Sequence, residues 1–121
     1  MKRDLELVRK ILLAMEAHDA GFAPDHFTIA GYDQEVIGHH VWLMGQGALV
    51  TAVDVTAMGD RSPVALPGSI TWTGHDFLDT VRNETVWSKV KIHLKDHALT
   101  LPFALVQDLA IKYAKSLAGL D

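Results

Sequence analysis

The sequence contains no cysteine. This absence excludes disulfide bonds, cysteine-ligated zinc sites and thiol nucleophiles, and it fits a protein of a reducing compartment. Long apolar runs are missing too, because the longest, such as residues 11–15, fall far short of the ~20 residues that a membrane-spanning helix requires. Charges from Lys2 to Lys10 also interrupt the N-terminus, where a secretory signal would carry an apolar stretch. We therefore expect a cytoplasmic protein that does not enter a membrane.

Sequence patterns that mark common enzymes are absent as well. No GxGxxG or GxxxxGK stretch is present to cradle a phosphate, and Ser62, Ser69 and Ser88 lack the paired glycines of a nucleophile elbow. His75 and Asp76 are adjacent and could form a catalytic pair, but a helix-capping role accounts better for Asp76. We therefore predict a protein that is not an enzyme, with no catalytic residue and no cofactor.

The seven histidines do not form a convincing metal-binding pattern. His39 and His40 are neighbours on a predicted helix and point to different faces of it. His93 and His97 have the four-residue spacing of helical metal ligands, but the glutamate of the zinc-protease pattern is missing between them. We predict that His39, His93 and His97 are solvated, that His40 and His75 make structural hydrogen bonds near the core, and that no metal is bound.

The length and composition are those of one globular domain. The chain has 121 residues, of which 49% are hydrophobic and 21% are charged, so it can bury a core. Its formal net charge of −4 is unfavourable for a protein that binds nucleic acid. We predict a single domain over residues 1–121.

The N-terminal third contains two predicted helices. Apolar residues recur at three- and four-residue spacing over residues 4–18, and Asp4 can cap the first turn of this helix. A short strand is expected at residues 27–29. The second helix is predicted over residues 33–46, with Asp33 as its N-cap and Gly47 as a left-handed C-cap.

A β-hairpin is predicted to follow the second helix. Residues 49–55 are rich in valine and threonine, residues 59–63 form a turn, and a second strand is expected at residues 69–72. Thr73 and Asp76 then have the spacing of a capping box at the start of a third helix. This hairpin is the candidate wing of a winged-helix domain.

The remaining residues are predicted to be helical. Asn83 can cap a helical segment, so residues 74–95 form either one kinked helix or two. Pro102 lies in the first turn of a last helix. The apolar stripe of that helix consists of Val106, Leu109, Ala110, Tyr113 and Leu117. The predicted fold is therefore α+β and winged-helix-like, with a core and hairpin wing in residues 1–73 and extra C-terminal helices packed on it in residues 74–121.

Two stretches resemble parts of winged-helix regulators. Residues 33–50 are similar to the recognition helix and the strand that follows it, and residues 70–78 are similar to the second wing strand and the turn into a terminal helix. The chain departs from that pattern between Met15 and Asp33, where little room is left for the usual middle helix of the DNA-binding core.

A closer resemblance covers nearly the whole chain. Residues 2–13, 71–79 and 81–87, together with His40 and Leu43, are similar to a phage- and prophage-associated bacterial family, domain-of-unknown-function family 2513. The resemblance implies a compact cytoplasmic protein encoded by a phage or host genome. It implies no chemistry, because none is assigned to the family.

The winged-helix resemblance suggests DNA binding, but the charges oppose it. The presumed recognition helix, residues 33–46, has two acids and no lysine or arginine, and the presumed wing has one cation, Arg61, against Asp54 and Asp60. A surface with few cations gains little affinity from counterion release. If DNA is bound, the predicted phosphate contacts are Arg3, Arg9, Lys10 and Arg61, and the residues nearest the bases are Gln34 and His39.

Protein recognition explains the same charge distribution without conflict. Trp42 is predicted to lie on the outer side of the second helix and is the first candidate for an anchor residue. Further candidates are Trp87, Tyr113 and Leu117, through which the chain could contact a protein partner or a second copy, although the last helix could equally use its apolar stripe for the core. We therefore favour a small regulatory or adaptor module that acts through protein–protein recognition, with a winged-helix DNA-binding transcriptional regulator as the alternative.

Overall fold

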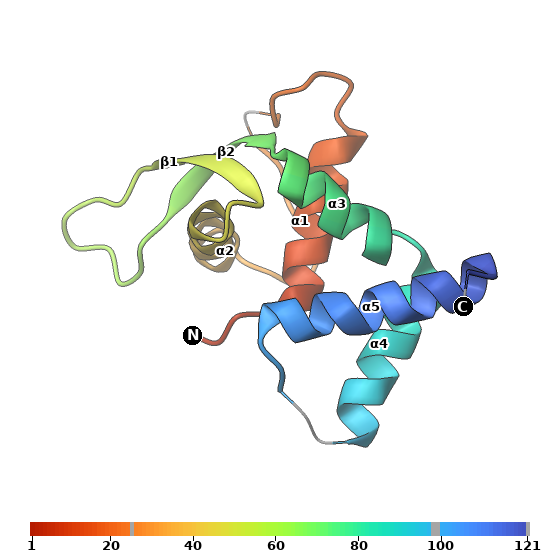
Figure 1. Cartoon of the computed structure of the whole chain (residues 1–121). Helices are drawn as coiled ribbons and strands as arrows, with labels where there is room; N and C mark the ends of the chain where they lie inside the picture. The colour runs from red at the N-terminus through yellow and green to blue at the C-terminus, as the bar shows by residue number, and fades with distance from the viewer. Residues whose placement is uncertain (25, 98–99, 121) are drawn as a thin grey trace. The chain divides into compact units, whose positions relative to one another are not determined.

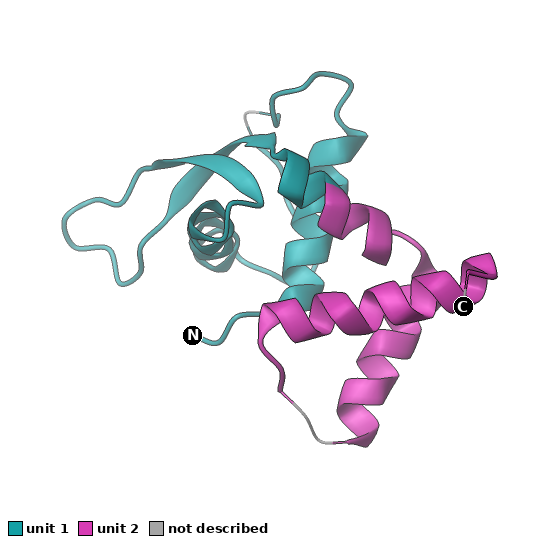
Figure 2. Ribbon diagram, viewed as in Figure 1, with its two compact units in different colours: residues 1–75 teal, residues 76–121 magenta. Residues whose placement is uncertain are grey.

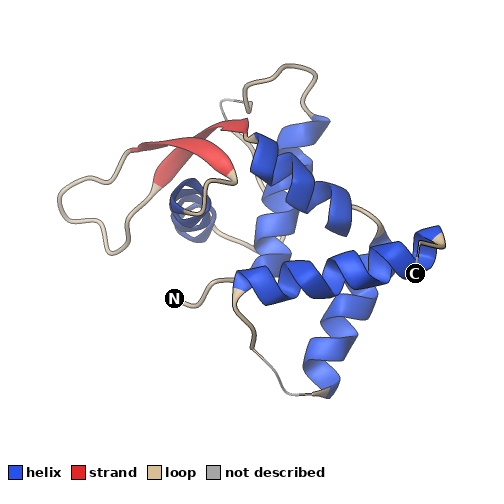
Figure 3. Ribbon diagram, in the orientation of Figure 1, coloured by secondary structure: helices blue, strands red, loops and turns tan. Residues whose placement is uncertain are grey.

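The computed structural model describes residues 1–24, 26–97 and 100–120, and these residues have an α+β fold of five helices and a two-stranded antiparallel hairpin (Figures 1 and 3). Contacts divide the chain into two compact units, residues 1–75 and 76–121 (Figure 2). The elements are α1 (Leu5–Ala17), α2 (Gln34–Gln46), β1 (Val50–Asp54), β2 (Ala65–Ile70), α3 (Trp72–Val81), α4 (Glu84–Asp96) and α5 (Phe103–Ala118). No helix in the described ranges combines the length and the apolar character needed to cross a membrane. The packing of the C-terminal helices on residues 1–73 stays a prediction.

The first unit is built around α1 and α2. The Asp4 carboxylate accepts a hydrogen bond from the Leu7 N–H (3.2 Å), which confirms the predicted N-cap of α1. α2 packs against α1 on one side and against both strands of the hairpin on another (Figure 1). The side chains that these two helices bury are mainly apolar and follow the helical repeat: Leu7, Val8, Ile11, Leu12 and Met15 in α1, and Ile37, Val41 and Met44 in α2.

His40 is the buried polar side chain on the inner face of α2. Its Nε2 accepts a hydrogen bond from the Asp4 backbone N–H (2.9 Å), so its proton lies on Nδ1, which donates to the Val36 carbonyl (2.9 Å). The Asp4 carboxylate also accepts a hydrogen bond from the Tyr32 hydroxyl (2.9 Å). The predicted structural role of His40 is confirmed, and through it the start of α1 is held to α2.

The hairpin differs from its predicted bounds. β2 begins at Ala65 rather than at residue 69, and Pro67 and Gly68 lie inside the strand rather than before it. The register changes between Val50 and Ala52 through a bulge, and Gly68 fits there because a Cβ at that position would lie 2.4 Å from the Thr51 hydroxyl oxygen. In the sequence, Pro67 and Gly68 suggested a turn before the strand. In the structure they lie within β2, with Pro67 at the edge of the sheet and Gly68 at the bulge.

Three local predictions were wrong. Residues 27–29 have no strand structure. Gly47 has a φ of −79°, and the left-handed residue is Ala48, with a φ of 60°, because the closing hydrogen bond runs from the Leu49 N–H to the Met44 carbonyl. The cap of α3 is Thr71 rather than Thr73.

The Thr71 cap places the beginning of α3 earlier than predicted. Its hydroxyl accepts a hydrogen bond from the Gly74 N–H (3.0 Å), so Trp72 and Thr73 are already helical. Gly74 approaches β1 closely, because a Cβ on it would lie 2.0 Å from the Leu49 carbonyl oxygen. His75 is exposed on α3, so the prediction that it lies near the core was wrong.

The second unit contains the rest of α3 and the helices α4 and α5. Asn83 accepts hydrogen bonds from the N–H groups of the first turn of α4, so residues 74–95 belong to two helices rather than one. α4 packs against α5, and the ring of Phe77 lies 4.7 Å from that of Phe103. Pro102 immediately precedes α5 as its N-cap residue. On the predicted stripe of α5, Val106 and Ala110 are buried.

Candidate functional site

The hairpin packs against one face of α2, and this face differs from the one that contacts α1. Two glycines make the close approach possible: a Cβ added at Gly38 would lie 3.2 Å from the Cβ of Val64, and one added at Gly45 would lie 3.0 Å from the Cβ of Ala52. These separations are shorter than ordinary carbon contacts of about 3.5–4.0 Å. Any larger residue at Gly38 or Gly45 would push the hairpin away from the helix.

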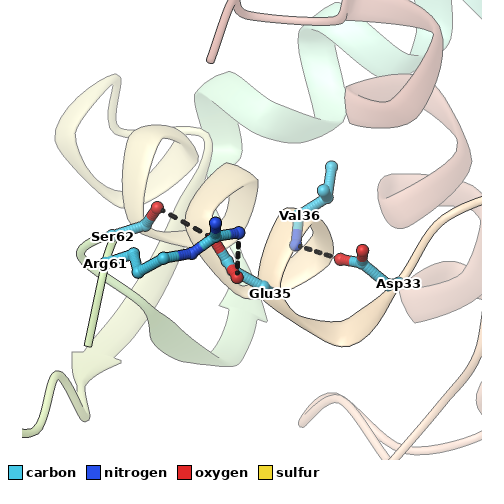
Figure 4. A network of polar contacts seen from close by, with 5 residues as sticks. All are labelled: Asp33, Glu35, Val36, Arg61 and Ser62. Atoms are coloured by element: carbon cyan, nitrogen blue, oxygen red, sulfur yellow. Dashed lines mark hydrogen bonds and ion pairs between the residues drawn. The ribbon is translucent and has the colours of Figure 1, made fainter. Parts of the chain in front are cut away.

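Polar contacts hold the N-terminal half of α2 to the end of the hairpin loop (Figure 4). Arg61 Nη2 donates to both carboxylate oxygens of Glu35 (3.2 and 3.1 Å), and the Ser62 hydroxyl donates to one of them (3.2 Å). The His39 ring contacts the Pro63 carbonyl oxygen through Nδ1 (2.8 Å). Asp33 caps the helix by accepting from the Val36 N–H (2.9 Å). The single cation of the hairpin is thus engaged by an acid of the presumed recognition helix.

Trp42 extends the same contact toward the C-terminal half of α2. Its ring stacks on that of His39, with 5.7 Å between the centroids, and its side chain is half-buried. Hydrogen bonds from Thr56, through the side chain and the backbone N–H, hold the pKa of Asp54 below its ordinary value, and a smaller contribution comes from a hydrogen bond with Trp42. Trp42 therefore contributes to the contact between α2 and the hairpin instead of pointing freely into solvent.

A cavity of about 350 Å³ opens between the N-terminal half of α2, residues 26–27 and β2. We call it the α2–hairpin cavity. Its apolar lining includes Ile37, Val41, Val64 and Leu66, and its polar lining includes Gln34, Glu35, Asp60, Arg61 and Ser62. Its size falls in the range of pockets that hold small ligands or single peptide side chains. Apolar walls with a few charged groups at one end suit recognition of a mixed apolar and polar partner.

Exposed apolar side chains border this cavity. Leu66 and Val55 both line it and remain 53% and 43% exposed. Val53, the register partner of Leu66 on β1, is 63% exposed but is not part of the lining, and Met58 in the hairpin loop is fully exposed. Val53 and Leu66 therefore form an exposed apolar pair across the two strands, and exposed apolar surface is a feature of interaction sites.

The residues predicted to contact DNA are in different environments. Gln34, His39 and Arg61 lie where α2 faces the hairpin, and the Gln34 amide donates to the Phe27 carbonyl (3.3 Å). Arg3 is exposed before α1, while Lys10 lies 4.0 Å from Glu6 and 5.7 Å from the centre of the Tyr32 ring. Arg9 is only 4% exposed. Its position on the buried side of α1 leaves it unable to meet a phosphate at the surface, which corrects the prediction.

The residues predicted to contact a protein partner also lie in different environments. Trp87 is 2% exposed, so it is a core residue of α4 rather than an interface anchor. Tyr113 is half-buried, and its hydroxyl lies 3.2 Å from Nδ1 of His93, whereas Leu117 is exposed. The sequence left open whether Trp72 belongs to the core or to the surface, and it is 85% exposed at the start of α3. Recognising Thr71 as the cap would have placed Trp72 on the first turn, outside the core stripe.

The histidines of the second unit contact each other and their helix. The rings of His93 and His97 are stacked with 4.3 Å between their centroids, and His97 Nδ1 lies 2.9 Å from the His93 carbonyl oxygen. His39 and His93 are half-buried, so the prediction that they are solvated was wrong, whereas His97 is exposed as predicted. Over residues 1–24, 26–97 and 100–120, no three histidine, aspartate or glutamate side chains are grouped as metal ligands.

Comparison with other proteins places the chain in a family. Its residues 2–100 match the sequence profile described as "Hypothetical protein (DUF2513)". It is 34% identical over 113 residues to a Haemophilus influenzae protein named "Uncharacterized protein", and the alignment covers 91% of this chain and 92% of that protein. No solved structure matches the chain. Because the profile spans well over half of the sequence, this chain belongs to the DUF2513 family.

Proposed function

We propose that this protein is a small, non-enzymatic adaptor that recognises a protein partner through the α2–hairpin cavity. One observation carries the proposal: the hairpin packs against α2 and leaves an open apolar cavity beside it. A cavity of this size can accept an apolar anchor side chain, which is the usual source of affinity in a small protein interface.

The order of elements supports a reduced winged-helix architecture as the scaffold. A helix, α2, is followed at once by an antiparallel hairpin and then by α3, and no helix is formed between α1 and α2 in the described residues. The phage association implied by the family resemblance fits a short regulatory module. A cytoplasmic location belongs to the same proposal.

DNA binding is less well supported by this geometry. A recognition helix reads bases with exposed side chains in the major groove, and the hairpin occupies one face of α2 at Gly38 and Gly45, which leaves less helix surface for bases. Arg61, which would contact phosphate, is bound to Glu35, and Arg9 is buried. Few cations remain in this region to contribute to counterion release.

The experiment is a selection of peptides that bind the full chain, from a random 12-residue library displayed on filamentous phage. Selected peptides are synthesised, and their affinities are measured for wild type, for Leu66→Lys and for the matched control Val53→Lys. These two exposed residues are register partners, but only Leu66 lines the cavity. We expect Leu66→Lys to weaken binding at least tenfold and Val53→Lys to change it less than threefold.

Two results would contradict the proposed function. One is that no peptide from the library is enriched over a blank matrix. The other is steeply salt-dependent binding of a mixed pool of duplex DNA, measured by fluorescence anisotropy at two salt concentrations, which would instead support the regulator alternative.

A further inference from the structure

Resting on the proposed function, we propose that the partner side chain anchored in the α2–hairpin cavity is an arginine. Its methylene stem supplies the apolar contact with the walls of the cavity, and its guanidinium pairs with the Asp60 carboxylate. Arginine is among the residues that dominate the affinity of protein interfaces.

The cavity belongs to the acidic part of the chain. Between Lys10 and Arg82 the sequence has nine acidic residues and one basic residue, Arg61, which gives a formal charge of −8. The rest of the sequence has ten basic and six acidic residues, a formal charge of +4. Every residue that lines the cavity lies within the acidic stretch. A surface of one sign attracts a partner of the opposite sign and disfavours a second copy of itself.

The basic residue of this stretch is already paired with an acid. Arg61 Nη2 donates to both carboxylate oxygens of Glu35 (3.2 and 3.1 Å), and the Ser62 hydroxyl donates to one of them (Figure 4). The charges of Glu35 and Arg61 therefore cancel. Among the lining residues that the structure describes, Asp60 is the one whose formal charge is left over.

The Asp60 carboxylate can accept further hydrogen bonds. Asp60 lines the cavity and is exposed, so it lies at the open side of the cavity. One of its oxygens accepts a hydrogen bond from the Ala57 N–H (2.8 Å), which holds the side chain in the hairpin loop. An ionised carboxylate has about four acceptor positions, so most of them remain for a partner.

A partner that enters the cavity has to satisfy an acid and apolar walls together. Covering the opening removes water from Asp60, and a carboxylate that loses water without gaining a partner is strongly unfavourable. The walls beside it are apolar at Ile37, Val41 and Val64. A purely aliphatic or aromatic anchor fits these walls but leaves the acid unpaired. A long basic side chain satisfies both, because its methylene stem is apolar and its charge is at the tip.

The geometry of a carboxylate favours arginine over lysine at this position. A guanidinium is planar and can donate two parallel hydrogen bonds to one carboxylate, whereas an ammonium acts as a point charge. A guanidinium is also more weakly hydrated than an ammonium, so it loses less when the opening is covered.

The test uses the synthetic peptides from the phage selection and replaces their arginines one at a time by citrulline, which keeps the length and shape of arginine but has no charge. Affinities are measured for wild type, for Asp60→Asn and for Asp108→Asn, a matched change at an exposed acid on α5. Asp60→Asn keeps a side-chain oxygen for the Ala57 N–H. Norleucine and alanine at the same peptide positions test the stem, since norleucine keeps an unbranched apolar chain and alanine removes it.

The inference predicts one critical arginine in the peptides. Citrulline at that position should weaken binding to wild type and to Asp108→Asn at least tenfold, and binding to Asp60→Asn less than threefold. Citrulline at other arginines should cost less than threefold. Alanine at the critical position should bind at least threefold more weakly than norleucine. The citrulline peptide should bind Asp60→Asn and wild type equally well, which shows that the variant is folded.

The contrary outcomes separate this inference from the proposed function. Peptides that bind in a Leu66-dependent manner without an arginine overturn the inference and leave the proposed function intact. Equal losses at every arginine, or an undiminished citrulline effect in Asp60→Asn, overturn the pairing with Asp60. Equal affinities for norleucine and alanine overturn the seating of the stem in the cavity. Failure of all peptides to bind overturns the proposed function itself, as does self-association in sedimentation equilibrium that Leu66→Lys abolishes.

Discussion

The contact between Gly45 of α2 and Ala52 of β1 can be tested by moving one methyl group across it. In the structure, the Cβ of Ala52 lies 3.0 Å from where a Cβ of residue 45 would be. Gly45→Ala therefore puts two methyl carbons about 0.5–1 Å closer than their preferred separation. Ala52→Gly removes the methyl group on the strand, and the double variant exchanges the two positions.

The expected free energies follow from two opposing effects. Alanine stabilises a helix interior by about 1 kcal/mol relative to glycine, while overpacking costs about 1–3 kcal/mol. Gly45→Ala alone should therefore lower the free energy of unfolding by about 0–2 kcal/mol. Ala52→Gly alone should lower it by about 0.5–1 kcal/mol, because glycine weakens a strand. The double variant keeps the helix gain and loses the clash, so it should be within about 0.5 kcal/mol of wild type.

Urea unfolding followed by far-UV circular dichroism measures the four free energies of this cycle. A coupling energy of about 1–3 kcal/mol is expected, since the two residues are in direct contact. Additive effects, with a coupling below about 0.5 kcal/mol, would refute the reasoning. The hairpin would then not pack closely against α2 at Gly45, and the geometric argument against a DNA-reading helix would be lost.

The remaining predictions concern the core, a buried histidine and one acid. Trp87→Ala should lower the free energy of unfolding by about 3–5 kcal/mol, whereas Trp72→Ala, at an exposed site, should change it by less than about 0.5 kcal/mol; thermal unfolding of both variants compares them directly. His40→Leu removes the acceptor of the partly buried Asp4 N–H and should cost about 1–3 kcal/mol by urea unfolding, and an unchanged midpoint would contradict the hydrogen bond. The lowered pKa of Asp54 means that its ionised form stabilises the fold above the ordinary pKa of 3.8, and that this contribution is lost as the pH falls through the lowered pKa. Asp54→Asn should therefore reduce the urea midpoint at pH 7 and have progressively less effect below pH 3.8, whereas an equal effect at both pH values would exclude a role for its charge.

Sequence reasoning predicted the helices well because their signals are local. Asp4, Asp33 and Asn83 each sit directly before a periodic apolar segment, and each accepts hydrogen bonds from its first turn. The apolar stripe of α1 is the buried one for the same reason. Such features depend on residues within one or two turns, so a single sequence contains them.

The hairpin was harder to predict because its details depend on distant residues. Pro67 and Gly68 are ordinary turn residues, and only their pairing with β1 across a bulge makes them part of a strand. The role of Gly38 was also hidden, since in the sequence it is simply a residue that weakens a helix. Gly38 is needed because Val64, the residue just before β2, packs against this position from much later in the chain. The cavity could not be predicted from sequence, because residues from three separate segments form it.

The way in which α2 is covered links the charge pattern of the sequence to the proposed function. A recognition helix needs exposed surface to enter the major groove, and the hairpin packed against α2 reduces the surface that this helix can offer. A helix so covered has no need of lysine or arginine for phosphates, and α2 has none. Glu35 instead uses its charge to bind Arg61 of the hairpin. The hairpin that occupies one face of α2 also forms one wall of the α2–hairpin cavity, so the features that count against a DNA regulator are the ones from which we infer a peptide-binding adaptor.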